Sequence, residues 1–232
     1  ILARKQTHGR GRQGRAWVNS DSYNLLMTLA LVPPRKNLSW MPLVAGIAVF
    51  EALESITKFY TELRTADLRG LRIKWPNDIY SFDNKIGGIL CESRVQNDAA
   101  YAMTVGIGLN IFSSPQLEGP IQATSFFQSA LPQMKNPPTE LKSEIRIALA
   151  RLIAEKVTAL VPDLSRGDTE KIRQKWMTAA KLNHYGEITT HDAQGKKISF
   201  RITELNAEGK LAGELTDLTT GESKSVELDQ PL

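Results

Sequence analysis

The fold is indicated most clearly by one stretch of the chain, Leu71-Arg72-Ile73-Lys74-Trp75-Pro76-Asn77-Asp78. Its first five residues predict a short strand, which should end at Pro76 because proline has no N–H to donate to a neighbouring strand. Pro, Asn and Asp all favour turns, so the strand should lead directly into a turn. Polar side chains at a strand end are typical of functional sites. Taken alone, however, this stretch is equally compatible with an ordinary turn.

Three further segments of similar character surround this stretch. A glycine–arginine run precedes it, His8-Gly9-Arg10-Gly11-Arg12-Gln13-Gly14-Arg15-Ala16-Trp17, and two glycine-containing segments follow, Lys85-Ile86-Gly87-Gly88-Ile89-Leu90 and Gly106-Ile107-Gly108-Leu109-Asn110. Glycine lets the backbone approach a ligand closely. Arginine supplies planar charged donors for carboxylate and phosphate oxygens. The run therefore predicts a loop around an anionic, ring-bearing small molecule, although such tracts also occur in disordered nucleic-acid-binding tails.

The remainder of the first 183 residues predicts a core of strands and helices. No apolar run approaches the roughly 20 residues that a membrane span needs. The single cysteine, Cys91, follows the apolar residues Ile89 and Leu90, which predicts a small buried residue, and a lone cysteine fits a reducing compartment. The expected elements are strands at 23–31, 71–75, 86–92 and 103–111, a loop at 112–138, and helices at 42–60, 139 to about 160 (ended by Val161-Pro162) and about 169–182.

The sequence changes in character near Asn183. Short alternating runs at 187–190, 197–203, 210–215 and 223–228 are separated by glycine-containing turns, which predicts a small all-β barrel. Residues 184–232 contain nine acids and five bases and so carry a net charge of −4. Because the whole chain carries +4, residues 1–183 carry +8. The basic part should prefer anionic ligands. We therefore expect two domains, 1–183 and 184–232.

Taken together and in this order, the four segments resemble those of the biotin protein ligases. Lys74-Trp75-Pro76-Asn77-Asp78 is that family's Lys-Trp-Pro-Asn-Asp motif letter for letter. The glycine–arginine run is similar to its biotinoyl-adenylate loop, and the two glycine-containing segments are similar to two of its strands. The resemblance covers nearly all of the chain. It implies an α+β fold, with a mixed β-sheet flanked by helices as in class II aminoacyl-tRNA synthetases and a small SH3-like C-terminal β-barrel.

The resemblance also implies an activity and its substrates. Such a ligase activates biotin with ATP as biotinoyl-5′-AMP and transfers it to one lysine of a biotin carboxyl carrier protein. Mg²⁺ is expected to accompany the triphosphate, with Asn77 and Asp78 as nearby candidate ligands. The chain should be monofunctional and cytoplasmic, without a membrane partner. Its oligomeric state, monomer or homodimer, stays open.

The resemblance also implies the site residues, which suit the chemistry of the first step: it brings two anions together and so needs positive charge between them. Lys85 and Arg12 are the expected catalytic residues, and Asp78 is expected to orient or deprotonate the acceptor lysine. The expected ligand-binding residues are Gln6 for the biotin head group, Arg10, Gly11 and Arg12 in the loop, Trp17 over the adenine, Asn77 and Asn110 near the adenine or its phosphate, and Asp78, Lys85, Gly87 and Gly88 around the junction.

Three alternatives remain open at this point. The first is a lipoate or octanoyl ligase or transferase of the same fold, the second a nucleic-acid-binding module, and the third a non-catalytic binder of biotin or biotinoyl-AMP. Members of the family usually have an upstream strand and turn with a Ser/Thr-rich motif that contacts biotin, and we expect that this numbering starts after it. No N-terminal winged helix for operator DNA is expected in this chain, so a repressor role is not expected.

Overall fold

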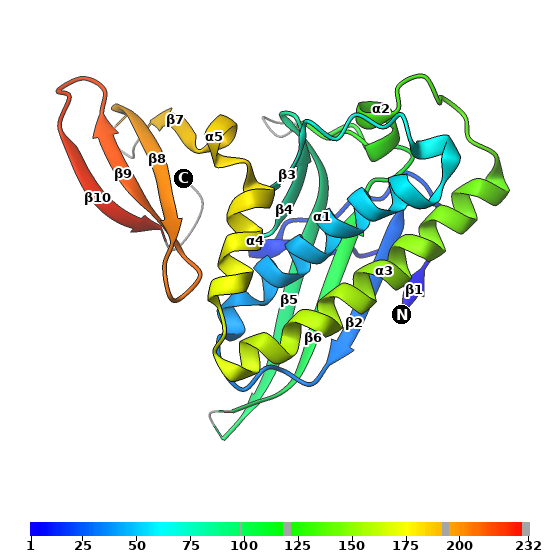
Figure 1. Cartoon of the computed structure of the whole chain (residues 1–232), viewed down its shortest axis with the longest axis horizontal. Coiled ribbons are helices and arrows are strands. Elements are labelled where there is room, and N and C mark those ends of the chain that lie inside the picture. Colours follow the sequence, from blue (N-terminus) through cyan, green and yellow to red (C-terminus); the bar gives the residue numbers. More distant parts are fainter. Residues whose placement is uncertain (98, 118–121, 192–194, 229–232) are drawn as a thin grey trace.

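The computed structural model describes residues 1–97, 99–117, 122–191 and 195–228. Two antiparallel sheets dominate it, a six-stranded sheet in the order β1-β2-β6-β5-β4-β3 and a four-stranded sheet in the order β10-β9-β8-β7 (Figure 1). Helices α1 (Met41–Phe59) and α3 (Thr139–Arg166) pack together across one face of the larger sheet. The α+β class is confirmed.

The larger sheet contains every strand expected from the first 183 residues. Its strands are β1 (Leu2–Ala3), β2 (Leu25–Leu31), β3 (Leu71–Lys74), β4 (Asp78–Ser81), β5 (Asn84–Gln96) and β6 (Ala99–Leu109). β1 and β4 were not expected. β4 begins at Asp78, directly after the proline, so the turn-forming residues connect two strands of a hairpin.

Helix α1 forms the centre of the core. Pro42 lies in its first turn. Of the residues expected to form its buried stripe, Val49, Leu53 and Ile56 are fully buried, whereas Tyr60 lies just beyond the helix end and is partly buried. Among the described residues, the stretch Leu38–Phe59 is long and apolar enough to cross a membrane, contrary to the expectation from sequence. However, 78% of its most apolar window is buried inside the protein, which is typical of a core helix.

Two expectations about the helical half were wrong. Helix α3 does not end at Val161-Pro162 but continues to Arg166, and Gly167 (φ 85°) terminates it. The burial of Leu160 and Leu164 on either side of Pro162 holds this last turn against the core. The expected loop at 112–138 contains a short helix, α2 (Phe126–Ala130), which begins with a capping box between Ser125 and Gln128. Helix α4 (Glu170–Ala180) matches the third expected helix and is followed by α5 (Leu182–Tyr185).

The C-terminal residues form the second sheet. Its strands are β7 (Glu187–His191), β8 (Lys197–Leu205), β9 (Leu211–Asp217) and β10 (Ser223–Leu228), close to the four expected runs. Over the described residues 187–191 and 195–228 they form an open sheet, not the closed barrel that was expected. Phe200, Leu205 and Leu211 belong to the same buried cluster as α1.

The β8–β9 turn joins the two sheets through hydrogen bonds. Ser39 Oγ donates to the carbonyl of Glu208 (2.8 Å), and the indole N–H of Trp40 donates to that of Ala207 (3.1 Å). The indole N–H of Trp75 donates to the carbonyl of Gly209 (3.1 Å). The C-terminal sheet is therefore held next to the Pro76-Asn77-Asp78 turn.

These bonds predict unequal costs for three conservative tryptophan substitutions. Trp40→Phe and Trp75→Phe each remove a donor from a turn carbonyl, whereas the buried indole N–H of Trp176 has no hydrogen-bond partner among the described residues. We expect Trp40→Phe and Trp75→Phe to lower the free energy of unfolding by about 1 kcal/mol more than Trp176→Phe does. Urea denaturation followed by circular dichroism measures this. Equal losses in all three variants would contradict the docking described.

Candidate active site

One row of residues crosses the larger sheet from its edge to its centre. Lys74 pairs with Asp78, Asp78 with Gly88, and Gly88 with Gly108. Directly opposed residues of antiparallel strands point to the same face, so these four residues share a face. The alternate positions, such as Ile73, contact helix α1 at Gly46. The row therefore lies on the face of the sheet that α1 does not cover.

The two glycines of the row make room for the indole of Trp17. A Cβ at Gly108 would lie 2.4 Å from Trp17 Cε2, and one at Gly88 would lie 3.1 Å from Trp17 Cζ3. A side chain at Gly108 would force the indole to move, and one at Gly88 would make a contact tighter than most Cβ atoms show. Three sequence segments thus meet here, because the glycine–arginine run places its closing tryptophan flat against β5 and β6.

Lys85 reaches this face through an irregularity in β5. Residues three apart in a regular strand point to opposite faces. Here Lys85 pairs with Tyr80 and Gly88 pairs with Asp78, with a register shift between Ile79 and Tyr80. The extra residue, Ile86, is fully buried. This β-bulge turns Lys85 and Gly88 to the same side of the sheet, and bulges commonly redirect side chains near active sites.

The ammonium group of Lys85 forms an ion pair with Asp78. Its Nζ lies 2.7 Å from Asp78 Oδ1, and each side chain is 21% exposed. The contact has ion-pair distance without the alignment of a hydrogen bond, since Asp78 Oδ1 has no hydrogen-bond partner. Lys85 Nζ also lies 5.9 Å from the centre of the Trp17 ring. A partly buried cation beside a flat ring can bind a carboxylate or phosphate.

The glycine–arginine run forms a small hairpin. Trp17 N–H donates to Gly9 O (2.9 Å) and Gly11 N–H donates to Arg15 O (2.7 Å). The turn between them needs left-handed backbone at Gln13 (φ 55°) and Gly14 (φ 73°). This geometry explains the glycine at position 14, since left-handed backbone suits glycine best.

The hairpin brings two arginines to the sheet. Arg12 Nη1 donates to Asn77 Oδ1 (3.3 Å), which links the run directly to the Lys-Trp-Pro-Asn-Asp motif. Arg10 Nη2 lies 3.3 Å from Glu92 Oε1, on a largely exposed surface. Arg12 is therefore the arginine that lies nearer to the row.

The two asparagines lie at strand ends and are largely engaged by backbone groups. Asn77 Nδ2 donates to Ile89 O (2.7 Å), and Ile89 N–H donates to Asn77 O (2.9 Å). Asn110 Nδ2 donates to Thr124 O (3.3 Å). Asn110 Oδ1 is buried without a hydrogen-bond partner among the described residues. Of the two amides, Asn110 thus retains an acceptor for another group.

Some expected residues are placed away from the row. Gln6 is exposed, and its side chain lies near Gly9, where a Cβ would be 3.1 Å from Gln6 Cδ. Gly87 lies on the helix-covered face, where a Cβ would be 3.0 Å from Leu109 Cδ1.

Burial raises the pKa of Cys91 to about 12, which keeps this thiol protonated at neutral pH.

Sequence reasoning missed two parts of this region. The segment Gln122–Thr124 runs beside Lys85, with Lys85 N–H donating to Gln122 O (2.9 Å) and Thr124 N–H to Lys85 O (3.0 Å). No sequence pattern indicated it. The face of the larger sheet that α1 does not cover is called the ligand face from here on. Arg72 and Lys74 were also overlooked as residues of this face, although their alternation with buried Leu71 and Ile73 indicates their position on it.

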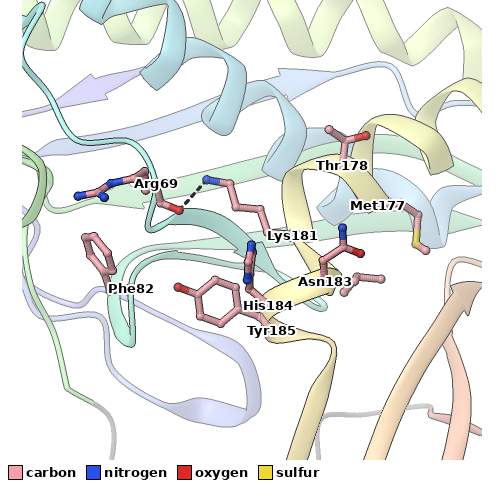
Figure 2. Close-up of a pocket in the computed structure, with 9 residues that line it drawn as sticks. Arg69, Phe82, Met177, Thr178, Lys181, Asn183, His184 and Tyr185 are labelled. Carbon is pink, nitrogen blue, oxygen red and sulfur yellow. Dashed lines mark hydrogen bonds between the residues drawn. The ribbon is translucent and has the colours of Figure 1, made fainter.

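Two hollows lie near the sheet. The smaller, about 360 Å³, is lined by Arg12, Trp75, Pro76 and Asn77 together with the β8–β9 turn. The larger, about 1100 Å³, lies between Phe82 and the α4–α5 segment (Figure 2). There Lys181 Nζ donates to the carbonyls of Leu68 and Arg69. Only the smaller hollow contains residues expected at the site.

Known proteins similar to this chain are biotin protein ligases. A 117-residue segment is 38% identical to the biotin–[acetyl-CoA-carboxylase] ligase of Paracoccus denitrificans, covering 50% of this chain and 45% of that protein. A similar segment is 33% identical to the bifunctional ligase/repressor BirA of Bacillus subtilis, covering 50% of this chain and 33% of that protein. The matches thus span less than half the length of these relatives.

Solved structures match over a larger part of the chain. The biotin protein ligase from Aquifex aeolicus in complex with biotin and ATP has a TM-score of 0.59 and 26% identity, covering 98% of this chain and 88% of that one. The biotin protein ligase from Leishmania major has a TM-score of 0.61 at 23% identity, covering 98% and 87%, which shows the shared fold. Residues 1–110 match the model of the biotin/lipoate A/B protein ligase family.

Proposed function

We propose that this chain is a biotin protein ligase, which activates biotin with ATP and transfers it to a lysine of a biotin carboxyl carrier protein. One observation carries the proposal: the four sequence segments converge on one face of the sheet, where Lys85, Asp78 and Trp17 surround the Gly88–Gly108 pair. The names of the matching ligases and the ATP and biotin of the Aquifex aeolicus complex support it.

In the first step, a carboxylate oxygen of biotin attacks the α-phosphorus of ATP. The bond between this phosphorus and the oxygen that bridges to the β-phosphate breaks, and pyrophosphate leaves with the electron pair. Both reactants are anions, so positive charge must hold them together. Lys85 lies beside the glycine pair and supplies that charge, and Arg12 supplies charge-assisted hydrogen bonds from the hairpin.

In the second step, a neutral lysine of the acceptor attacks the carbonyl carbon of the mixed anhydride, and AMP leaves. A lysine must lose its proton before it can attack. Asp78 Oδ1 lies 2.7 Å from Lys85 Nζ. Once Lys85 binds the phosphate, Asp78 can accept the proton of the acceptor lysine or orient that lysine. We therefore assign Asp78 to the acceptor side of the reaction.

The remaining assignments rest on placement for Trp17 and Asn110, and on the resemblance to the ligases for Gln6, Arg10 and Gly11. Trp17 forms a flat wall beside Lys85 for the adenine, and Asn110 Oδ1 is a free acceptor at the end of β6. We assign Gln6 to the biotin head group, and Arg10 and Gly11 to the loop that encloses the ligand. Mg²⁺ would be bound chiefly through ATP phosphates, because the described residues bring no three His, Cys, Asp or Glu side chains together and Asp78 offers one carboxylate.

We also propose a division of the chain at about Asn183 and action in the cytoplasm. The C-terminal sheet, residues 184–232, would close the site from the side of the β8–β9 turn, which lines the smaller hollow with Arg12 and Asn77. Its excess of acids makes it unsuited to nucleic acid.

Substitution of Lys85 tests the first step. Lys85→Ala should lower the rate of biotin-dependent ATP–pyrophosphate exchange by about 100-fold or more, because the site loses its principal positive charge. Lys58→Ala, at the exposed end of α1, is the matched control and should exchange at the wild-type rate. Exchange that survives in Lys85→Ala, or that wild type shows with lipoate and not with biotin, would contradict the proposal.

A glycine substitution tests whether Trp17 forms part of the site. In Gly108→Ala the new methyl would lie 2.4 Å from Trp17 Cε2, so the indole must move. We expect ATP to bind about tenfold more weakly or worse, because Trp17 is assigned to the adenine, and tryptophan fluorescence to change. Gly106→Ala is the control two residues earlier on the same face, where a Cβ meets nothing closer than 3.5 Å. Wild-type affinity in Gly108→Ala would show that the indole has no part in binding.

A further inference from the structure

Two cations on the ligand face have no role in the reaction described so far. Lys74 is opposite Asp78 and Arg72 is opposite Tyr80 in the β3–β4 pair. Because opposed residues share a face, both lie on the same side of the sheet as Lys85. Strand β4 separates them from β5, so Lys74 and Lys85 approach Asp78 from opposite sides.

The local charges do not balance. Asp78 already pairs with Lys85. Among the described residues, neither Lys74 nor Arg72 has a carboxylate within ion-pair distance. The ammonium of Lys74 lies 5.0 Å from the centre of the Tyr80 ring. The guanidinium of Arg72 lies 4.8 Å from the Tyr80 ring and 4.0 Å from the Tyr185 ring. Aromatic faces attract cations but do not neutralise them.

Arg72 is placed at a cost to the fold, whereas the side chain of Lys74 is exposed. Arg72 is only 8% exposed, and its Nε has no hydrogen-bond partner among the described residues. Burial lowers the pKa of Arg72. Burial also lowers the pKa of Lys74, and the charges of Arg72 and Lys85 lower it further while Asp78 opposes them. An uncompensated charge away from water is unfavourable, and an anion bound here would offset it.

The two cations that line the larger hollow, Lys181 and Arg69, already have partners. Its lysine, Lys181, donates to the carbonyl of Arg69 (Figure 2) and to that of Leu68. Arg69 itself is paired with Asp67 at 2.7 Å. Tyr185 lines that hollow and also contacts the guanidinium of Arg72. The unbalanced positive charge therefore lies on the ligand face and next to Lys85.

We propose that Lys74, with Arg72 behind it, forms an anion subsite that holds the pyrophosphate portion of ATP beside Lys85. This inference rests on the proposed function. As the bond from the α-phosphorus breaks, negative charge builds up on the departing pyrophosphate, and a cation fixed next to it stabilises that charge. Lys85 then serves the α-phosphate and the biotin carboxylate, and Lys74 serves the leaving group. Arg72 acts through its positive field and by fixing Tyr80, because it is itself buried.

Calorimetric titration with inorganic pyrophosphate tests the subsite directly. Lys74→Met keeps the length of the side chain and removes the charge, so it should weaken pyrophosphate binding about tenfold or more while the affinity for biotin stays at the wild-type value. Lys74→Arg should retain most of the affinity, and Lys58→Met should retain all of it. Pyrophosphate affinity in Lys74→Met within about twofold of wild type would overturn the proposal.

A second measurement uses the unaltered chain and so does not depend on the folding of a variant. Acetylation of Lys74 by an amine-reactive reagent, followed by mass spectrometry, should slow when pyrophosphate is added, whereas acetylation of Lys58 should not. Unchanged labelling of Lys74 would overturn the subsite even where exchange is active. Protection of Lys74 in a chain that shows no biotin-dependent exchange would support the subsite and contradict the proposed function.

Discussion

The arrangement of the site depends on one extra residue in β5. Without the bulge at Ile86, Lys85 and Gly88 would point to opposite faces, and the ammonium group could not meet Asp78. Burial of Ile86 in the core holds the bulge in place, so the packing of the helix-covered face fixes the charge on the ligand face. Fold and chemistry are thus coupled at a single strand position.

The same face explains why the four sequence segments have their composition. The glycines of β5 and β6 leave space that the indole of Trp17 fills, and the glycine–arginine hairpin carries that indole to them. Arg12 connects the hairpin to Asn77, and Trp75 connects the same turn to the β8–β9 turn of the C-terminal sheet. Each segment therefore helps to position another, and the site forms only where all four meet.

Sequence patterns predicted most of this fold, and the failures have physical causes. Alternation and helical spacing identified four strands of the larger sheet and the long helices because burial of one face is a local signal, but β1 and β4 were missed. Pro162 was taken as a helix end, but tertiary burial of Leu164 outweighed the local preference. The bulge at Ile86 has no local signature, and neither does the pairing of Lys85 with Gln122–Thr124, which depends on long-range contacts. Resemblance named the site residues, but the register of the strands was needed to show that Gly87 faces the core, and the alternation that places Lys74 on the ligand side was overlooked.

A crystal structure of this chain with a non-hydrolysable analogue of biotinoyl-5′-AMP tests the central claim most directly. The account predicts the phosphate beside Lys85 Nζ and the adenine against the free face of the Trp17 indole, whose other face lies on the Gly88–Gly108 pair. A ligand bound instead in the hollow between Phe82 and α5, with Lys85 in contact with Asp78 alone, would contradict it.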